Sequence, residues 1–220
     1  FRVFGLTQDG SLKRQIKGQM EGIGSRPRLR ATGADGSVLI DRNYENAAVP
    51  DVAVALTTAG AWLRDDQRIN PIAVGHRVVH GGPDYDRPVR VDQEVVTKLE
   101  RFISLAPLHQ PYNLAPIRSA LARFPDMPQV ACFDTAFHRN HGALADRYAI
   151  PEALYAEGVR RYGFHGLSYE FIASSLPQVA PDIASKRVIV AHLGSGASMC
   201  ALEGGRSVES SMGFTALDGL

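Results

Sequence analysis

Residues 72–83 read IAVGHRVVHGGP, and no other stretch indicates the fold class as strongly. This stretch is short, rich in β-branched residues and ends in a Gly-Gly-Pro turn, which predicts a buried strand. Amphipathic patterns lie on either side of it. Asp51 is placed to cap a helix that runs to about Asp66, and Asp92 is placed to open another. Helices that alternate with buried strands are typical of an α/β layered fold.

The alternation continues along the chain. We expect Asn113 to cap a third helix that ends near Phe124, and residues 129–133 to form the next strand. A further helix is predicted over residues 167–176. Residues 187–202 read RVIVAHLGSGASMCAL, which predicts two strands joined by a glycine turn. This hairpin breaks the helix–strand alternation, so we expect it to begin a second, mixed sheet.

Composition excludes several classes of protein. The chain has 220 residues, of which 45% are hydrophobic and 21% charged, values that exclude a disordered tail, a collagen-like chain and a coiled coil. The net charge of +1 provides no general attraction for nucleic acid or a membrane surface. No apolar run approaches the roughly 20 residues of a membrane helix. Cys132 and Cys200 are too few for a disulfide framework and are predicted to be buried free thiols.

An arginine stripe lies beside a predicted hairpin. Asp35-Gly36 is a favourable turn between strands at residues 28–31 and 37–40. Arg26, Arg28 and Arg30 alternate with apolar residues, as on one solvated face of a strand. An RNA-binding patch is the less favoured alternative, because no aromatic stacking platform accompanies the arginines.

The first candidate for chemistry is Arg77. On a strand, Arg77 and Val79 share one face, whereas His76 and His80 share the other. A guanidinium among β-branched residues needs an anion partner, which is either a ligand carboxylate or phosphate or a structural Asp. A metal site at the two histidines is weakly supported, because no third ligand stands at a matching spacing.

Two further candidates follow along the chain. His109 lies in a loop bounded by prolines and is either a site residue or an ordinary surface histidine. Asp134 follows a predicted strand directly, and at that position a carboxylate binds Mg²⁺ or orients a reacting group. Capping of the next helix explains Asp134 equally well.

Glycines mark the last two candidates. Gly163 and Gly166 bracket an aromatic residue and His165. In the turn at residues 194–196, two glycines let backbone N–H groups approach an anion, although plain turn chemistry is the simpler explanation. Met199 stands where a dinucleotide-binding motif has its third glycine, and no P-loop occurs in the chain.

Taken together, six ordered motifs resemble the acetate and butyrate kinase family. These are Gly75-His76-Arg77-Val78-Val79-His80-Gly81-Gly82, Ala106-Pro107-Leu108-His109, Phe133-Asp134-Thr135-Ala136-Phe137-His138, Tyr162-Gly163-Phe164-His165-Gly166, His192-Leu193-Gly194-Ser195-Gly196 and Ser211-Met212-Gly213-Phe214-Thr215. The matching motifs run from about residue 75 to residue 220, and residues 1–70 carry little signature.

The resemblance implies an α/β fold of the two-lobed sugar kinase/Hsp70/actin-like (ribonuclease H-like) type, with the second lobe truncated. Residues 1–136 would form the amino-terminal, acetate-binding lobe without its first strand, and residues 137–220 would begin the nucleotide-binding lobe. The implied reaction is reversible phosphoryl transfer from ATP to acetate with Mg²⁺, giving acetyl phosphate and ADP. The family implies a cytoplasmic homodimer for the full-length protein, without nucleic-acid or membrane partners.

The resemblance also implies roles for individual residues. Arg77 would bind the acetate carboxylate or the transferring phosphoryl group, Asp134 would be the acid/base, and His165 would stabilise the transition state with His109 nearby. The apolar acetate pocket would comprise Val79, Leu108 and Phe164, and the ATP phosphates would lie against His192, Leu193, Gly194, Ser195 and Gly196; the resemblance assigns no metal ligand here. Because acetate is already an anion at pH 7, we expect Asp134 to position Arg77 or the Mg²⁺ shell rather than act as a base.

Departures from the family pattern leave alternatives open. Ser195 replaces the family's usual Asn, and Ala216 stands where the family usually has Pro, which would enlarge the methyl pocket. A propionate or butyrate kinase is therefore an alternative. The family's first strand and its Gly-Thr-Arg segment are not in the chain, so we expect these 220 residues alone to be inactive. A non-catalytic polypeptide that binds small carboxylates or phosphates is the alternative from another functional class.

Overall fold

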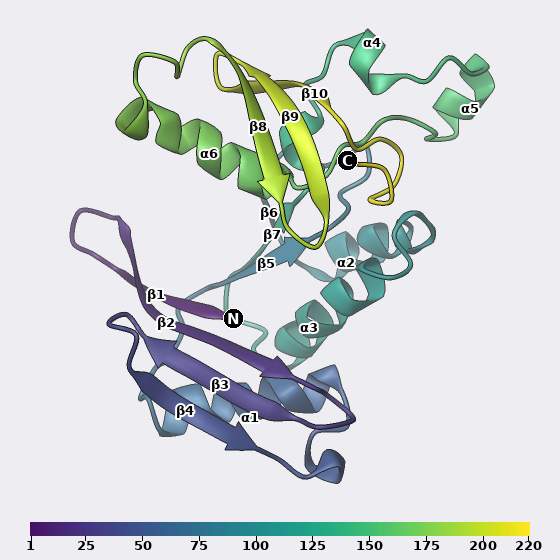
Figure 1. Cartoon of the computed structure of the whole chain (residues 1–220). Coiled ribbons are helices and arrows are strands. Elements are labelled where there is room, and N and C mark those ends of the chain that lie inside the picture. Colours follow the sequence, from purple (N-terminus) through teal and green to yellow (C-terminus); the bar gives the residue numbers. More distant parts are fainter. The chain divides into compact units, whose positions relative to one another are not determined.

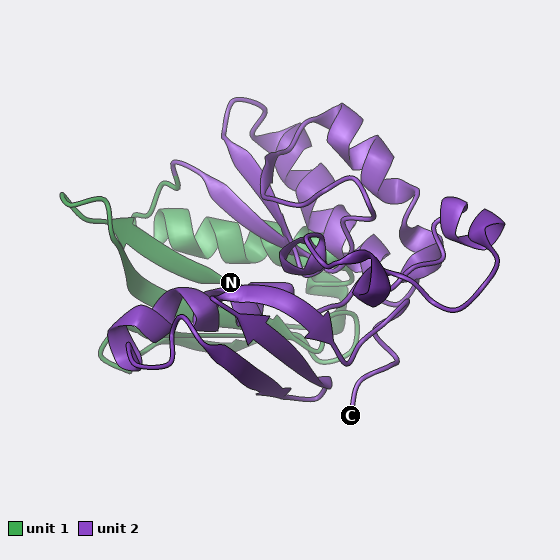
Figure 2. Cartoon of the chain, turned by 90° about the horizontal axis from the view of Figure 1, so that it is seen from above, with its two compact units in different colours: residues 1–71 green, residues 72–220 purple.

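The computed structural model describes residues 1–220, which divide into two compact units, residues 1–71 and 72–220 (Figure 2). The division of this chain at residue 71 differs in place from the lobe boundary predicted at residue 136. That boundary concerns the lobes of the family fold and stays a prediction.

The first unit is an antiparallel sheet with one helix on it (Figure 1). Its strands pair in the order β1-β2-β3-β4. The elements are β1 (Arg2–Leu6), β2 (Leu12–Glu21), β3 (Arg28–Gly33), β4 (Val38–Asn43), the 3-10 helix η1 (Asn46–Ala48) and α1 (Val52–Asp65). Ala59 and Trp62 of α1 pack on Ile16 and Leu29 of the sheet, and this contact forms the core of the unit.

Local sequence signals explain two elements of this unit. Asp51 accepts a hydrogen bond from the backbone N–H of Val54 at 2.9 Å, which confirms the predicted helix cap. The predicted β3–β4 hairpin is also confirmed. Arg28 donates two hydrogen bonds to Asp41 of the neighbouring strand, as expected for a solvated face of paired charges.

The second unit begins with a sheet in which β5 (Val74–Val78) and β7 (Gln129–Phe133) pair in parallel. The short β6 (Val89–Arg90) completes the order β5-β7-β6. Two helices cover this sheet, α2 (Gln93–Glu100) and α3 (Gln110–Arg123), with the 3-10 helix η2 (Ile103–Leu105) between them. Their apolar residues meet Val78 and Phe133 in the largest core of the chain.

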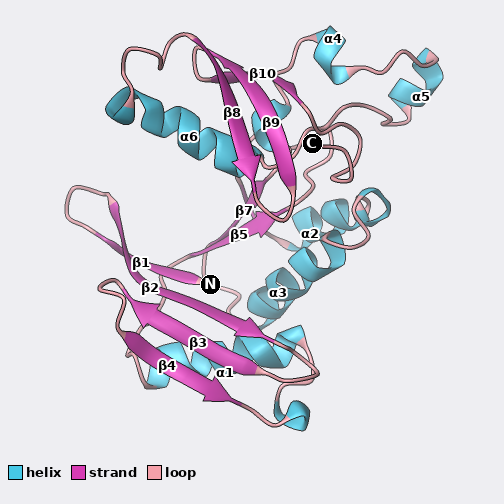
Figure 3. Cartoon of the chain, viewed as in Figure 1, coloured by secondary structure: helices cyan, strands magenta, loops and turns pink.

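A second sheet in this unit has the order β10-β9-β8 and is antiparallel throughout (Figure 3). Its strands are β8 (Arg187–Leu193), β9 (Ala197–Glu203) and β10 (Arg206–Ser210). The segment between the two sheets contains η3 (Ala136–His138), α4 (Ala143–Asp146), α5 (Glu152–Ala156) and α6 (Gly166–Val179). Helix α6 packs on the sheet through Tyr169, which contacts the cluster of Cys200 and Leu202.

The predicted strands and helices of this unit are confirmed, with one wrong boundary. Helix α3 begins at Gln110 rather than after Asn113, because Pro111 is accommodated in the first turn, where its missing N–H is not needed. The side chain of Asn113 instead accepts a hydrogen bond from the backbone N–H of Val79 at 2.9 Å. Cys132 and Cys200 are free thiols. No helix is both long and apolar enough to span a membrane.

Candidate functional site

An ion pair at the carboxyl ends of two parallel strands is the centre of the candidate site. Arg77 of β5 donates from Nε to both oxygens of Asp134, at 3.2 and 3.1 Å, and from Nη2 to Oδ2 at 2.6 Å. The side chain of Asp134 is 2% exposed, whereas that of Arg77 is 66% exposed. The buried carboxylate therefore fixes the guanidinium while leaving it open to an anion.

His165 is attached to the same strand end. The backbone N–H of Gly166 donates to the carbonyl oxygen of Asp134 at 2.8 Å. A Cβ at Gly166 would lie 2.3 Å from that oxygen, so only glycine permits this approach. His165 precedes α6 with a φ of 58°, a left-handed conformation that is rare outside glycine and is concentrated at functional sites. Arg77, Asp134 and His165 are thus brought to one place.

The imidazole of His165 is held on both sides. Its Nδ1 is 2.8 Å from the hydroxyl of Ser198, and its ring stacks on His192 at 4.1 Å between centroids. Burial lowers the pKa of His165, the charges of His192 and Arg77 lower it further, and Asp134 opposes them. His165 is therefore a neutral hydrogen-bonding group at pH 7.

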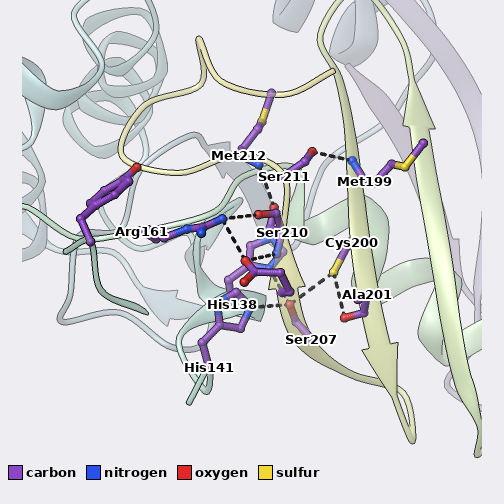
Figure 4. A network of polar contacts seen from close by, with 12 residues as sticks. His138, His141, Arg161, Met199, Cys200, Ala201, Ser207, Ser210, Ser211 and Met212 are labelled. Carbon is purple, nitrogen blue, oxygen red and sulfur yellow. Dashed lines mark hydrogen bonds and ion pairs between the residues drawn. The ribbon is translucent and has the colours of Figure 1, made fainter. Parts of the chain in front are cut away.

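A buried polar network supports the segment that follows Asp134 (Figure 4). His138 of η3 lies 3.0 Å from the carbonyl oxygen of Phe164 through Nε2 and 2.7 Å from Ser207 through Nδ1. Because a carbonyl only accepts, His138 carries its proton on Nε2, and Ser207 donates to Nδ1. Ser207 in turn accepts from Nε2 of His141, at 2.7 Å. The network joins η3 to β10 and to the loop that precedes His165.

An apolar cluster lies beside these polar groups. Val79 and Phe164 are buried together with Met212, and Ala216 packs against them. Leu108, the third predicted pocket residue, is 75% exposed and lies outside this cluster. Two of the three residues predicted for the acetate pocket are therefore brought together in the structure.

The remaining predicted residues lie in or next to two turns, and all of them except His192 are exposed. His109 is exposed and precedes α3, and its backbone N–H donates to Ala106 of the apolar cluster at 3.0 Å. His192 is partly buried, and its Nδ1 lies 3.1 Å from the hydroxyl of Ser168. Leu193, Gly194, Ser195 and Gly196 are exposed at the tip of the β8–β9 hairpin. A Cβ at Gly196 would lie 3.2 Å from Nε2 of His165, so this turn adjoins the site.

The structure does not join His76 and His80 into a metal site. Nε2 of His76 contacts the Gln129 side chain at 2.9 Å, whereas Nδ1 of His80 accepts from the backbone N–H of Gly82. No group of three or more His, Cys, Asp and Glu side chains is arranged to hold a metal ion.

Sequence reasoning missed three residues that shape the site: Tyr169, Ser198 and Asn113. Tyr169 and Ser198 are fully buried and joined at 2.5 Å, on α6 and β9 respectively. Both are polar residues at inward positions of otherwise apolar elements, and this is the signal that would have identified them.

Comparisons with known proteins identify the family of this chain. The chain belongs to the acetokinase family, whose sequence profile matches residues 5–220. It is 71% identical to an acetate kinase of Nitrobacter hamburgensis over 220 residues, which are 100% of this chain and 54% of that protein. It is 59% identical to an acetate kinase of Rhizobium meliloti over 96% of this chain and 54% of that protein. The chain thus spans about half the length of the curated relatives it matches.

Solved structures give the same result for the fold. A propionate kinase from Francisella tularensis superposes with a TM-score of 0.88 at 32% identity, covering 100% of this chain and 56% of that one. An acetate kinase from Porphyromonas gingivalis superposes with a TM-score of 0.83, also at 32% identity and with the same coverage. The predicted fold and family are confirmed.

Proposed function

We propose that the full-length protein transfers the γ-phosphoryl group of ATP reversibly to acetate, giving acetyl phosphate and ADP. The observation that carries this proposal is the exposed guanidinium of Arg77, fixed by the buried Asp134 beside His165. Phosphoryl transfer depends on positioning and on positive charge around the phosphoryl oxygens more than on covalent help. Membership of the acetokinase family supports the choice of acetate as acceptor.

Arg77 binds the acetate carboxylate or the transferring phosphoryl group in this proposal. Its Nε and Nη2 face Asp134, which leaves the remaining donors of the guanidinium for the substrate. Acetate is ionised at neutral pH and needs no base to remove a proton. Asp134 therefore acts by positioning Arg77.

His165 and His109 supply hydrogen-bond donors around the phosphoryl group. His165, neutral and held against Ser198, offers its Nε2 edge toward the turn at residues 194–196. That turn, with His192 and Leu193, is the proposed site of the ATP phosphates. His109 is exposed at the start of α3 and would supply a second donor.

Mg²⁺ fits this site as a companion of ATP. Asp134 is the carboxylate at this strand end, and both of its oxygens accept hydrogen bonds from Arg77. Mg²⁺ typically keeps several waters and is held by few carboxylates together with substrate phosphates. A single carboxylate that contacts the ion through a water molecule is consistent with this kind of site. The ion would supply positive charge to the phosphates. Asp134 would orient its water shell.

The buried cluster of Val79 and Phe164 would receive the acetate methyl group, with Leu108 at the exposed rim. A propionate kinase is the second candidate, because one superposes with this chain at a TM-score of 0.88 and Ala216 borders the cluster. One methylene in an apolar pocket changes kcat/KM by about 10- to 200-fold. The ratio of kcat/KM for acetate, propionate and butyrate therefore distinguishes the two candidates.

We predict that Val79→Ala raises the propionate-to-acetate ratio of kcat/KM roughly tenfold, because it opens a buried part of the pocket. Leu108→Ala is the matched variant at the exposed rim and is expected to change the ratio less. Steady-state kinetics of the full-length protein with the two acids measure both. Equal effects of the two variants would contradict the proposed pocket.

The protein is further proposed to be a cytoplasmic homodimer in its full-length form, with no nucleic-acid or membrane partner.

A hydroxamate assay for acetyl phosphate tests the main proposal, on this chain and on a full-length form. Turnover of acetate by the full-length form is expected, and none by these 220 residues. Carboxylate or phosphate binding without turnover in the full-length form would favour the non-catalytic alternative.

A further inference from the structure

Two buried hydroxyl groups have no part in the chemistry proposed above. Tyr169 of α6 and Ser198 of β9 are both 0% exposed. Hydroxyl groups are rarely buried so completely without a partner that requires them. Ser198 lies between Tyr169 and His165, so the three side chains form a chain that leads from the core to the site.

The distances identify two consecutive hydrogen bonds. The Tyr169 hydroxyl lies 2.5 Å from Oγ of Ser198, and Oγ lies 2.8 Å from Nδ1 of His165. Burial raises the pKa of Tyr169, while its hydrogen bond to Ser198 lowers it. Ser198 is the one residue within hydrogen-bonding distance of the Tyr169 hydroxyl.

The direction of each proton follows from that end of the chain. The Tyr169 hydroxyl is fully buried and Ser198 is its one hydrogen-bond partner, so its O–H donates to Ser198. Each hydroxyl has one proton, so Ser198 donates its proton to Nδ1 of His165. Nδ1 is then the unprotonated nitrogen, and the ring proton is on Nε2.

We propose that Tyr169 and Ser198 are positioning residues that hold the neutral His165 in its Nε2–H tautomer, with this N–H directed at the transferring phosphoryl group. The direction toward a phosphoryl group rests on the proposed function, whereas the tautomer does not. The Nε2–Cε1 edge of the ring faces Gly196, whose added Cβ would lie 3.2 and 3.3 Å from these two atoms. This edge is the part of His165 that a phosphate in the glycine turn would meet.

The opposite tautomer would place a proton on Nδ1 and reverse the chain. Ser198 would then donate to Tyr169, and the buried Tyr169 O–H would be left without an acceptor. In the opposite tautomer, His165 would also present an acceptor lone pair to a negatively charged group. The Nε2–H tautomer avoids both costs.

Nitrogen-15 NMR of histidine-labelled protein tests the tautomer without substrate, and His165→Gln assigns the signals. In the wild-type chain we expect Nδ1 of His165 to show the downfield shift of an unprotonated nitrogen and Nε2 the shift of a protonated one. Tyr169→Phe and Ser198→Ala are expected to produce a mixture of tautomers. Tyr112→Phe, on an exposed tyrosine, is the matched control and should change nothing. A protonated Nδ1 in the wild type, or tautomers unchanged in both variants, would overturn the proposal.

Kinetics of the full-length form add a second readout. Tyr169→Phe is expected to lower kcat roughly tenfold with little change in the KM for acetate, because the donor is misdirected while the pocket is intact. Ser198→Thr retains the hydroxyl. Its kcat should therefore stay close to the wild-type value, whereas that of Ser198→Ala should fall. If the full-length wild type has no turnover, the proposed function fails while the tautomer result stands. Normal kcat in Tyr169→Phe would remove the positioning role alone.

Discussion

Arg77 and Asp134 differ sharply in exposure, and this separates their effects on activity and on stability. The guanidinium is 66% exposed and the carboxylate 2% exposed. Solvent screens the exposed guanidinium, which limits what the ion pair contributes to folding. Its geometric effect is larger, because three hydrogen bonds fix the plane of the guanidinium at the site.

Asp134→Asn is therefore predicted to lower kcat of the full-length form about 100-fold or more, with a small change in the free energy of unfolding. Kinetics and denaturant unfolding measure the two quantities. Asp41→Asn is the matched control, since it removes the carboxylate that holds Arg28 in the other unit. Near-normal turnover of Asp134→Asn, with unchanged dependence on Mg²⁺, would refute both a catalytic and a positioning role.

Gly196 is close enough to His165 for one methyl group to matter. A Cβ there would lie 3.2 Å from Nε2, closer than ordinary van der Waals contact. We predict that Gly196→Ala displaces the imidazole and lowers kcat/KM for ATP about tenfold. Gly60→Ala, where an added Cβ meets nothing within 4 Å, is the control and should keep full activity. Equal kinetics in the two variants would show that the turn does not adjoin the functional imidazole.

At the scale of elements, η3 is held by the hydrogen bonds of its buried His138 as well as by apolar packing. His138 is fully buried between Ser207 and Phe164, and burial lowers its pKa to about 3. His80 is also fully buried, and burial lowers its pKa to about 3 as well. Both histidines are neutral in the folded chain and take up protons near pH 6.5 when it unfolds.

This difference predicts acid sensitivity. Because the unfolded chain binds more protons between pH 6.5 and about 3, stability is greatest above pH 6.5 and falls as the pH decreases through that window. Each unit of pKa difference corresponds to about 1.4 kcal/mol. We expect His138→Gln to reduce the slope of unfolding free energy against pH, measured by denaturant titration from pH 7 to 4. Exposed His109→Gln should leave the slope unchanged, and equal slopes for both variants would contradict the assignment.

Element boundaries were predictable where a side chain caps them. Asp51 and Asp92 accept hydrogen bonds from the third residue after them, and both helices begin where the sequence indicates. Helix α3 has no such cap, since His109, the residue that precedes it, makes no capping side-chain hydrogen bond. Asn113 has the residue type of a cap but bonds to Val79 in another element, and sequence alone does not distinguish the two uses.

At the scale of the whole molecule, the first two strands, β1 and β2, were not predicted from the sequence. Strand β2 (Leu12–Glu21) buries only Ile16 and Gly18, so it lacks a clear alternation of apolar residues. The motifs around Arg77 and Asp134 could be recognised because each interrupts or follows an apolar strand, and the motif around His165 because two glycines bracket it. The link between His165 and Ser198 could not be recognised from the sequence, because these residues are 33 positions apart and meet only in the folded chain.

Parallel pairing of β5 with β7 places Arg77 opposite Cys132, and Asp134 follows at the end of the same strand. Side chains along a strand alternate between its faces, so inserting or deleting one residue in either strand would turn one member of the ion pair away from the other. Chain length in these two strands is therefore constrained as tightly as residue identity. An insertion scan would find them intolerant, whereas the exposed turn at residues 8–10 would accept extra residues.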